Sequence, residues 1–360
     1  MTTPLPHIAA MAPYALSQMT APEGTRLVSL SQNESFRPPS PHVLEAAIQS
    51  IADTALYPDP DWTNLRSGLA ALHGIPVDTI LCGSGSLDLI ACIARAFAGP
   101  GRAVLAPEHA YPFFRSAAQM AGARFDTAPE TDATVSVDAL LKATQPDTQI
   151  VFVANPGNPT GTRVPRSELV RLRRGLRDDI LLVIDEAYGE FADRFGERHF
   201  DLVQEGATVV LRTFSKAYGM AGFRVGWGTF PPDVSAEVRK VMNPNNISMP
   251  AQVAACAALE DIAYMEETCR FIEQARDQAA LTLSNAGFRV IPSHTNFLLI
   301  DLETTAKAQS ADAALRARGI FLRGQSGAGL PQMLRLTIGP ADAMTAALSC
   351  LTTWKQETLT

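Results

Sequence analysis

The segment 180-ILLVIDEAYGEF-191 places a run of apolar residues directly before two acids and a tyrosine. A strand without polar alternation is typical of a parallel sheet that is buried on both faces. In such sheets, ligands bind beyond the carboxyl ends of the strands. We therefore expect Asp185, Glu186 and Tyr188 to lie at a functional site. A strand followed by two acids also fits a metal site or an ATPase motif, but no GxxxxGKS or GxxxxGKT loop accompanies it.

Other apolar runs alternate with helical stretches and extend this pattern: 79-TILC-82, 103-AVLA-106, 149-QIVFVA-154, 208-TVVLRT-213 and 225-VGWGTF-230. The alternation predicts an α/β fold with three layers and a mostly parallel sheet. After residue 240 the pattern changes to a long helix over 250–286 and strands at 296–302 and 333–339, which indicate a smaller α+β domain. We expect a large domain over 41–244 and a small domain made of 1–40 and 245–360.

The composition of the 360-residue chain restricts its class. A formal net charge of −7 argues against a nucleic-acid-binding protein, because phosphate neutralisation needs a basic surface. The five cysteines are scattered and odd in number, so a disulfide framework or a zinc site is not expected. The start MTTPLPHIAAMAPY lacks the features of a signal peptide, and 87-LDLIACIARAFAG-99 contains charges that a membrane span avoids. We expect a cytoplasmic enzyme without a metal or a membrane partner.

A lysine follows another strand in 211-LRTFSKAYGMAGFRVGW-227. An isolated lysine is usually a surface residue. At a strand end among small residues, however, Lys216 can be desolvated, which lowers the pKa of its amine and makes it a nucleophile.

Two loops supply candidate hydrogen-bond donors. In 151-VFVANPGNPTG-161 the prolines and glycines define a turn that carries the amides of Asn155 and Asn158. In 82-CGSGSLDLI-90 a Gly/Ser loop precedes a helix, where free backbone N–H groups can hold an anion. Each loop alone also fits an ordinary structural turn.

Taken together, the segments NPGNPTG (155–161), DEAY (185–188) and TFSKAYGMAGFRVG (213–226) resemble the fold-type I aminotransferases that depend on pyridoxal 5'-phosphate, and within them the histidinol-phosphate aminotransferase-like group. The resemblance runs from about residue 8 to residue 340. It implies that Lys216 forms the Schiff base and moves the substrate proton. It also implies which residues bind the cofactor. Asp185 is expected at the pyridine nitrogen, Asn158 and Tyr188 at the phenolate oxygen, and Tyr111 at the ring face. The residues expected at the phosphate are Gly85, Ser86, Thr213, Ser215 and Arg224.

The resemblance further implies a homodimer and a substrate site. Tyr57 matches a tyrosine that such enzymes lend to the phosphate across the dimer interface, and Arg335 matches the arginine that binds the α-carboxylate. Tyr14 and Arg323 match the residues that bind the distal phosphate of histidinol phosphate, with Asn158 also near the substrate. Two positions depart from the family, since 33-NESF-36 replaces a NENP-like segment and Leu87 replaces an acid.

The expected reaction is ping-pong transamination between histidinol phosphate and 2-oxoglutarate, in histidine biosynthesis. Three alternatives stay open. The chain could be an aromatic amino-acid transaminase with an apolar pocket, or a decarboxylase or lyase of the threonine-phosphate type. It could also be a non-catalytic regulator that binds pyridoxal phosphate, although such proteins usually carry a DNA-binding module for which this chain lacks length and basic charge.

Overall fold

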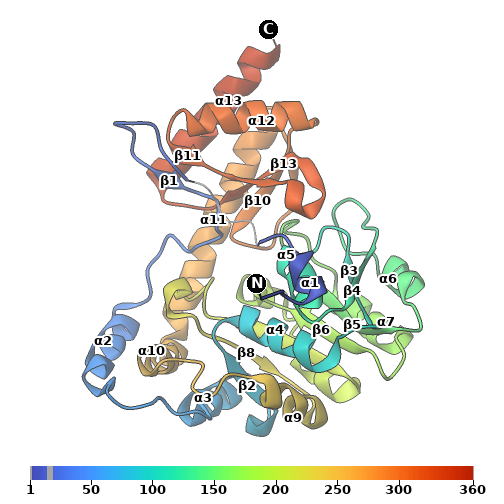
Figure 1. Ribbon diagram of the computed structural model, residues 1–360. Helices are drawn as coiled ribbons and strands as arrows, with labels where there is room; N and C mark the ends of the chain where they lie inside the picture. The colour runs from blue at the N-terminus through green and yellow to red at the C-terminus, as the bar shows by residue number, and fades with distance from the viewer. Residues whose placement is uncertain (1, 14–18, 360) are drawn as a thin grey trace.

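Two bodies of unequal size make up the protein in this computed structural model, which describes residues 2–13 and 19–359. The larger body lies at the bottom of Figure 1 and the smaller one at the top, and the long helix α11 (Ile262–Asn285) runs between them. None of the helices in the described residues is long and apolar enough to cross a membrane.

The larger body contains a seven-stranded sheet with the order β2-β8-β7-β6-β5-β3-β4. All neighbours are parallel except β8, which runs antiparallel to both β2 and β7. The strands are β2 (Ile80–Gly83), β3 (Ala103–Pro107), β4 (Arg124–Ala128), β5 (Thr148–Ala154), β6 (Leu181–Asp185), β7 (Thr208–Thr213) and β8 (Gly226–Thr229). Every residue of β6 is buried, as its lack of polar alternation predicts. The predicted α/β class with a mostly parallel sheet is confirmed.

Helices pack against this sheet and against one another. The helix α4 contacts β2, β7 and β8, while α6 and α7 form a pair near β3 and β4. These and the remaining helices of the larger body are α2 (Pro41–Ser50), α3 (Thr63–His73), α4 (Ser86–Phe97), α5 (Pro112–Met120), α6 (Val137–Ala143), α7 (Arg166–Gly175), α8 (Gly189–Ala192) and α9 (Pro232–Val241). The short α1 (Pro6–Ala9) packs against α5.

The smaller body is built on a four-stranded antiparallel sheet with the order β12-β13-β10-β9. Its elements are β9 (Arg289–Ile291), β10 (Phe297–Asp301), α12 (Thr305–Arg316), β11 (Ile320–Phe321), β12 (Arg323–Gln325), β13 (Leu330–Thr337) and α13 (Ala341–Leu359). The N-terminal segment joins this body, because β1 (Val28–Ser29) pairs in parallel with β11.

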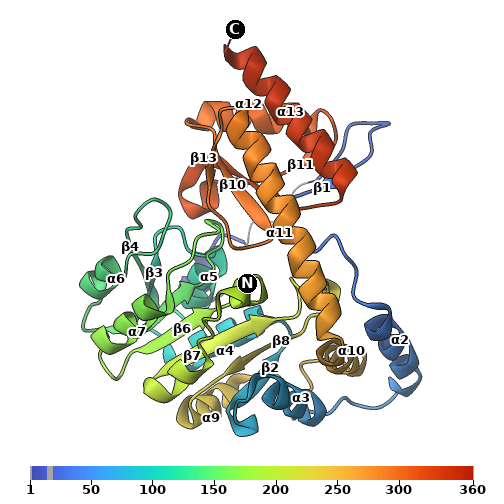
Figure 2. The same cartoon turned by 180° about the vertical axis from the view of Figure 1, so that it is seen from behind.

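The helix expected over 250–286 is two helices. The backbone of Asp261 leaves the helical region (φ −119°, ψ 51°), which separates α10 (Met249–Glu260) from α11. In both ribbon views α10 lies beside α2, and it contacts α2 and α3 (Figures 1 and 2). We propose a large domain over 41–244 and a small domain made of 1–40 and 245–360. Within the second range, α10 packs on the larger body and α11 carries the chain across to the smaller one.

Two pieces of backbone meet at Gly226, where β8 passes the loop before α4. A Cβ atom on Gly226 would lie 2.2 Å from the backbone nitrogen of Ser86 and 2.5 Å from the carbonyl carbon of Gly85. Contacts this short with backbone cannot be relieved by turning a side chain. Glycine at this position therefore keeps the Gly85–Ser86 loop seated against the sheet.

We predict that Gly226→Ala lowers the free energy of unfolding by about 2 kcal/mol or more, as expected when a well-packed site is overfilled. Gly222→Ala is the matched control, because a Cβ atom at Gly222 would meet no atom within 4 Å. Urea denaturation of both variants checks this, and equal stabilities would contradict the packing argument.

Candidate active site

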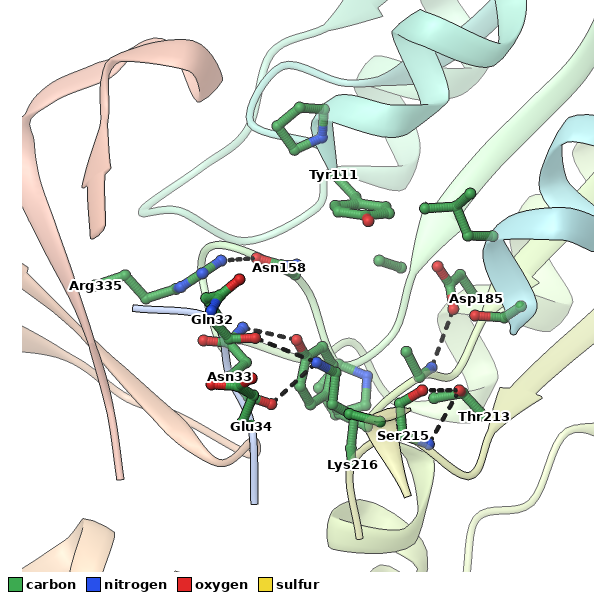
Figure 3. Close-up of a pocket in the computed structure, with 18 of the residues that line it drawn as sticks. Gln32, Asn33, Glu34, Tyr111, Asn158, Asp185, Thr213, Ser215, Lys216 and Arg335 are labelled. Carbon is green, nitrogen blue, oxygen red and sulfur yellow. Dashed lines mark hydrogen bonds between the residues drawn. The ribbon is translucent and has the colours of Figure 1, made fainter. Parts of the chain in front are cut away.

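A cavity of about 340 Å³ lies where the carboxyl ends of β5, β6 and β7 face the smaller body (Figure 3). It brings together most of the residues that the sequence singles out: Ser86, Tyr111, Asn158, Asp185, Tyr188, Thr213, Ser215, Lys216, Arg224, Arg323 and Arg335. Gly85 adjoins this cavity through Ser86. Tyr57 does not line it and is 86% exposed in the single chain. Tyr14 lies outside the described residues.

Lys216 lies inside this cavity with its amine held by backbone. Its Nζ donates to the carbonyl oxygen of Asn33 over 2.9 Å and contacts that of Gln32 at 3.4 Å. Burial, followed by the positive charge of Arg335, lowers the pKa of Lys216 to about 8. At neutral pH the amine is therefore available in its nucleophilic form far more often than that of an ordinary lysine, whose pKa is about 10.4.

Asp185 ends β6 and is 4% exposed. Its Oδ1 accepts one hydrogen bond from the backbone N–H of Ala187 (3.0 Å). Burial raises the pKa of Asp185 to about 6, because a carboxylate loses hydration in the protein interior. This carboxyl group is therefore placed to pair with a cationic or N–H group of a ligand that enters the cavity.

Behind Asp185, a buried guanidinium ties the strand ends together. Arg212 is 1% exposed, and its Nε donates to Glu186 Oε2 over 2.7 Å. The two terminal nitrogens of Arg212 donate to Asp193 (2.8 and 3.0 Å) and to Glu190 (3.3 Å). Burial acts to raise the pKa of Glu186, but the charge of Arg212 together with the hydrogen bond and charge of His199 outweighs it, and the pKa is lowered. The sequence analysis did not identify Arg212, because a charged residue in a strand gives no sign of a buried partner.

The loop before α4 and the loop after β7 form a cradle for an anion. Gly85 (φ +80°) lies so close to Arg224 that a Cβ atom would be 2.4 Å from its Nη2. Arg224 has a left-handed backbone (φ 57°), and its Nη1 contacts Ser215 Oγ at 3.4 Å. Thr213 Oγ1 donates to Ser215 Oγ over 3.0 Å and accepts from the Ser215 N–H over 3.2 Å. A guanidinium, hydroxyls and a helix start thus converge, as phosphate binding requires.

On the opposite side of Figure 3, Arg335 reaches in from β13. It donates to Asn158 Oδ1 over 2.6 Å and to the carbonyl oxygen of Ser31 over 2.8 Å. Asn158 therefore turns its amide toward the cavity, whereas Asn155 does not. The side chain of Asn155 is buried and bonds both backbone groups of Val164, at 2.9 and 3.1 Å, so its part is structural.

Asn33 is a second residue that the sequence analysis did not identify. Its Nδ2 donates to the hydroxyl of Tyr188 over 2.7 Å, and its Oδ1 accepts from Thr337 over 3.1 Å. Its backbone is left-handed (φ 54°), a conformation that asparagine tolerates better than most residues. The N-terminal segment is thereby joined to both bodies at the cavity. The only signal in the sequence was the match to the NENP-like segment, in which 33-NESF-36 keeps the asparagine and departs at Ser35 and Phe36.

Comparison with known proteins identifies the class. The chain belongs to the aminotransferase class I and II family, whose profile matches residues 25–351. It is therefore an enzyme of the aminotransferase class. The described residues contain no group of three or more His, Cys, Asp or Glu side chains that could hold a metal ion.

Among individual proteins, histidinol-phosphate aminotransferases are similar to this chain over almost their full length. That of Paramagnetospirillum magneticum is 40% identical, covering 95% of this chain and 96% of the relative. That of Rhodospirillum rubrum is 41% identical, covering 97% of this chain and 95% of the relative. The crystal structure of histidinol-phosphate aminotransferase from Sinorhizobium meliloti in complex with pyridoxal-5'-phosphate superposes with a TM-score of 0.91 at 28% identity, covering 99% of both chains. The resemblance found from the motifs is confirmed.

The same fold also serves a different substrate. The N-succinyldiaminopimelate aminotransferase of Mycobacterium tuberculosis superposes with a TM-score of 0.82 at 25% identity, covering 91% of this chain and 93% of that one. The substrate must therefore be argued from the residues of the cavity.

We predict that Lys216 of the cofactor-free protein reacts with an amine reagent with a midpoint near pH 8. Because the neutral amine is the nucleophile, the rate should rise as pH rises through the lowered pKa of about 8 and level off above it. Mass spectrometry of the Lys216 peptide after trinitrobenzenesulfonate labelling measures this, with Lys216→Arg as the blank. A midpoint at pH 10 or higher would mean that the cavity does not desolvate this amine.

We also predict that Arg212→Met lowers the free energy of unfolding by about 3–5 kcal/mol, because it removes the guanidinium that pairs with the carboxylates of Glu186 and Asp193. Arg174→Met is the matched control, since Arg174 is 71% exposed and pairs with Glu205 at the surface. Chemical denaturation of both variants gives the comparison. A loss at Arg212 no larger than at Arg174 would contradict the role of the buried pair.

Proposed function

We propose that this enzyme is a pyridoxal-phosphate-dependent histidinol-phosphate aminotransferase that uses 2-oxoglutarate as the amino acceptor in a ping-pong reaction. The observation that carries the proposal is a pair of arginines. Arg323 on β12 and Arg335 on β13 are direct partners in the antiparallel register, and both line the cavity that holds Lys216. Like charges placed opposite each other on neighbouring strands repel, so this arrangement suits a multiply charged anion such as a phosphate.

In histidinol phosphate, the phosphate is esterified to the carbon that stands in the place of the carboxylate carbon of an amino acid. We infer that Arg335, with Arg323 beside it, binds the substrate phosphate in one half-reaction and the carboxylates of glutamate or 2-oxoglutarate in the other. The planar guanidinium suits both groups because each offers paired oxygens. Tyr14 belongs to the same proposal as a substrate residue, and Asn158 is held in place by Arg335.

The residues at the other end of the cavity support the cofactor. Pyridoxal phosphate, when bound, supplies a carbonyl that condenses with amines and a ring that accepts electrons. The buried carboxyl group of Asp185 suits the ring nitrogen, since Ala187 N–H takes up only one of its oxygens. The cradle at Gly85, Ser86 and Arg224 suits the phosphate. A side chain at Gly85 would collide with the Arg224 guanidinium.

We assign the remaining side chains as follows. Lys216 binds the cofactor carbonyl through Nζ and holds the substrate proton there during transfer. Tyr188 and Asn158 would orient the ring oxygen, and Tyr111, which lies at the top of Figure 3, would contact the ring face. Ser215 and Thr213 supply hydroxyl groups near Arg224 that can bind the phosphate.

We further propose a homodimer to which Tyr57 of each chain contributes. Tyr57 is 86% exposed, and apolar residues in the sequence before it are exposed as well: Leu44, Ile48, Ile51 and Leu56. Apolar side chains grouped in this way on a surface suit a partner subunit. The cytoplasm is the proposed compartment, because all five cysteines are free, as expected where thiols stay reduced.

Half-reaction spectra test the proposed function. Histidinol phosphate should convert the visible absorption band of the bound cofactor to that of its amine form, and borohydride reduction before substrate should attach the cofactor to Lys216. Phenylalanine and threonine phosphate serve as comparison substrates. Conversion by phenylalanine but not by histidinol phosphate would assign the enzyme to aromatic amino acids, and loss of carbon dioxide from threonine phosphate would assign it to the lyases.

We predict that Arg323→Ala lowers kcat/KM for histidinol phosphate by roughly 10- to 100-fold, the value of a charge-assisted hydrogen bond. The loss should be smaller for unphosphorylated amino donors. Arg289→Ala, in the same sheet but outside the cavity, is the control. Steady-state kinetics with both donors measure the effect, and equal losses for both would argue against phosphate binding by Arg323.

A further inference from the structure

The charged groups of the cavity leave one carboxylate unassigned. Among the described residues that line it, the cations are Lys216, Arg224, Arg323 and Arg335, and the acids are Asp185 and Glu34. The proposed function accounts for all four cations and for Asp185. Glu34 remains, next to Asn33 and Lys216 in Figure 3.

The backbone of Glu34 is fixed although its side chain is exposed to the cavity. Asn296 Nδ2 donates to the carbonyl oxygens of both Asn33 (3.1 Å) and Glu34 (3.3 Å). The left-handed turn at Asn33 (φ 54°) directs the chain into this position, at a conformational cost of about 1–3 kcal/mol. Strain of this kind persists where the surroundings determine the conformation and is common at ligand sites.

The substrate of the proposed reaction offers three groups. The phosphate matches the arginine pair, and the amine meets the cofactor at Lys216. The imidazole is the third group, and it differs from the rings of phenylalanine and tyrosine because it carries ring N–H donors and titrates near neutral pH. A carboxylate that projects from a fixed backbone into the cavity is a suitable acceptor for such a ring.

We propose that the Glu34 carboxylate accepts a hydrogen bond from the imidazole ring of the substrate and so selects it over an apolar ring. This inference rests on the proposed function and assigns to Glu34 the third substrate group. The arginine pair then selects for the phosphate, and Glu34 selects for the side chain. Because Glu34 also lies in the electric field around Lys216, its substitution can affect the reactivity of the amine, so a test must separate the two effects.

The test compares two phosphorylated donors that differ only in the ring, histidinol phosphate and phenylalaninol phosphate. In the wild-type enzyme, kcat/KM should favour histidinol phosphate at least about tenfold, and Glu34→Gln should remove most of this preference. An effect on Lys216 alone would change both donors equally and leave the ratio unchanged. Glu23→Gln, at an exposed glutamate outside the cavity, is the matched control and should keep the wild-type ratio.

The outcomes separate this inference from the proposed function. If the wild-type enzyme does not convert histidinol phosphate, the proposed function fails. If it converts histidinol phosphate but accepts phenylalaninol phosphate equally well, or if Glu34→Gln keeps the wild-type preference, the function stands and the role of Glu34 is wrong. Unfolding midpoints of the two variants show whether a loss of folding contributes.

Discussion

The ion pair between Arg212 on β7 and Glu186 after β6 is the interaction on which the geometry of the cavity depends. Asp185 precedes Glu186, and Lys216 follows Arg212 by four positions, so this pair joins the two strand ends that carry them. A buried guanidinium is costly to desolvate, and its attraction to an acid compensates only when the geometry is good and the remaining donors are satisfied. Here Asp193 and Glu190 take up the other donors of Arg212. Glycine at position 189 provides the space for this guanidinium, since a Cβ atom at Gly189 would lie 2.3 Å from Arg212 Cζ.

The cavity is completed by parts of the chain that are distant in sequence. Asn33 comes from the N-terminal segment and Arg335 from β13, yet they meet Tyr188 and Asn158 of the larger body through hydrogen bonds of 2.7 and 2.6 Å. Each of these bonds places a polar side chain before a ligand arrives. Such preorganisation reduces the entropy that binding and catalysis would otherwise lose.

The sequence predicted the parts of the fold that have strong local signals. Strands buried on both faces gave apolar runs, as in residues 181–184 of β6 and 209–211 of β7. β4 gave none, because it lies at the edge of the sheet and most of its residues are partly or fully exposed. The short strands β9, β11 and β12 have two or three residues each, too few for a periodic pattern. The reversed direction of β8 depends on its pairing with β2 and β7, which no local pattern encodes.

The residues of the cavity likewise divide into those with a local signal in the sequence and those without one. Lys216 and Asp185 stand at strand ends within recognisable motifs, whereas Arg212 depends on acids that approach only after folding. In the function that we propose, the cradle and the strand-end acid serve the chemistry common to aminotransferases, and they come from the larger body. The groups to which we assign substrate selection come from the smaller body and the N-terminal segment, where Arg323, Arg335 and Glu34 line the cavity. Because these groups lie on β12, on β13 and in an irregular segment, they can change without disturbing the buried strands. This separation is a physical reason why one fold can keep its chemistry and accept different amino donors.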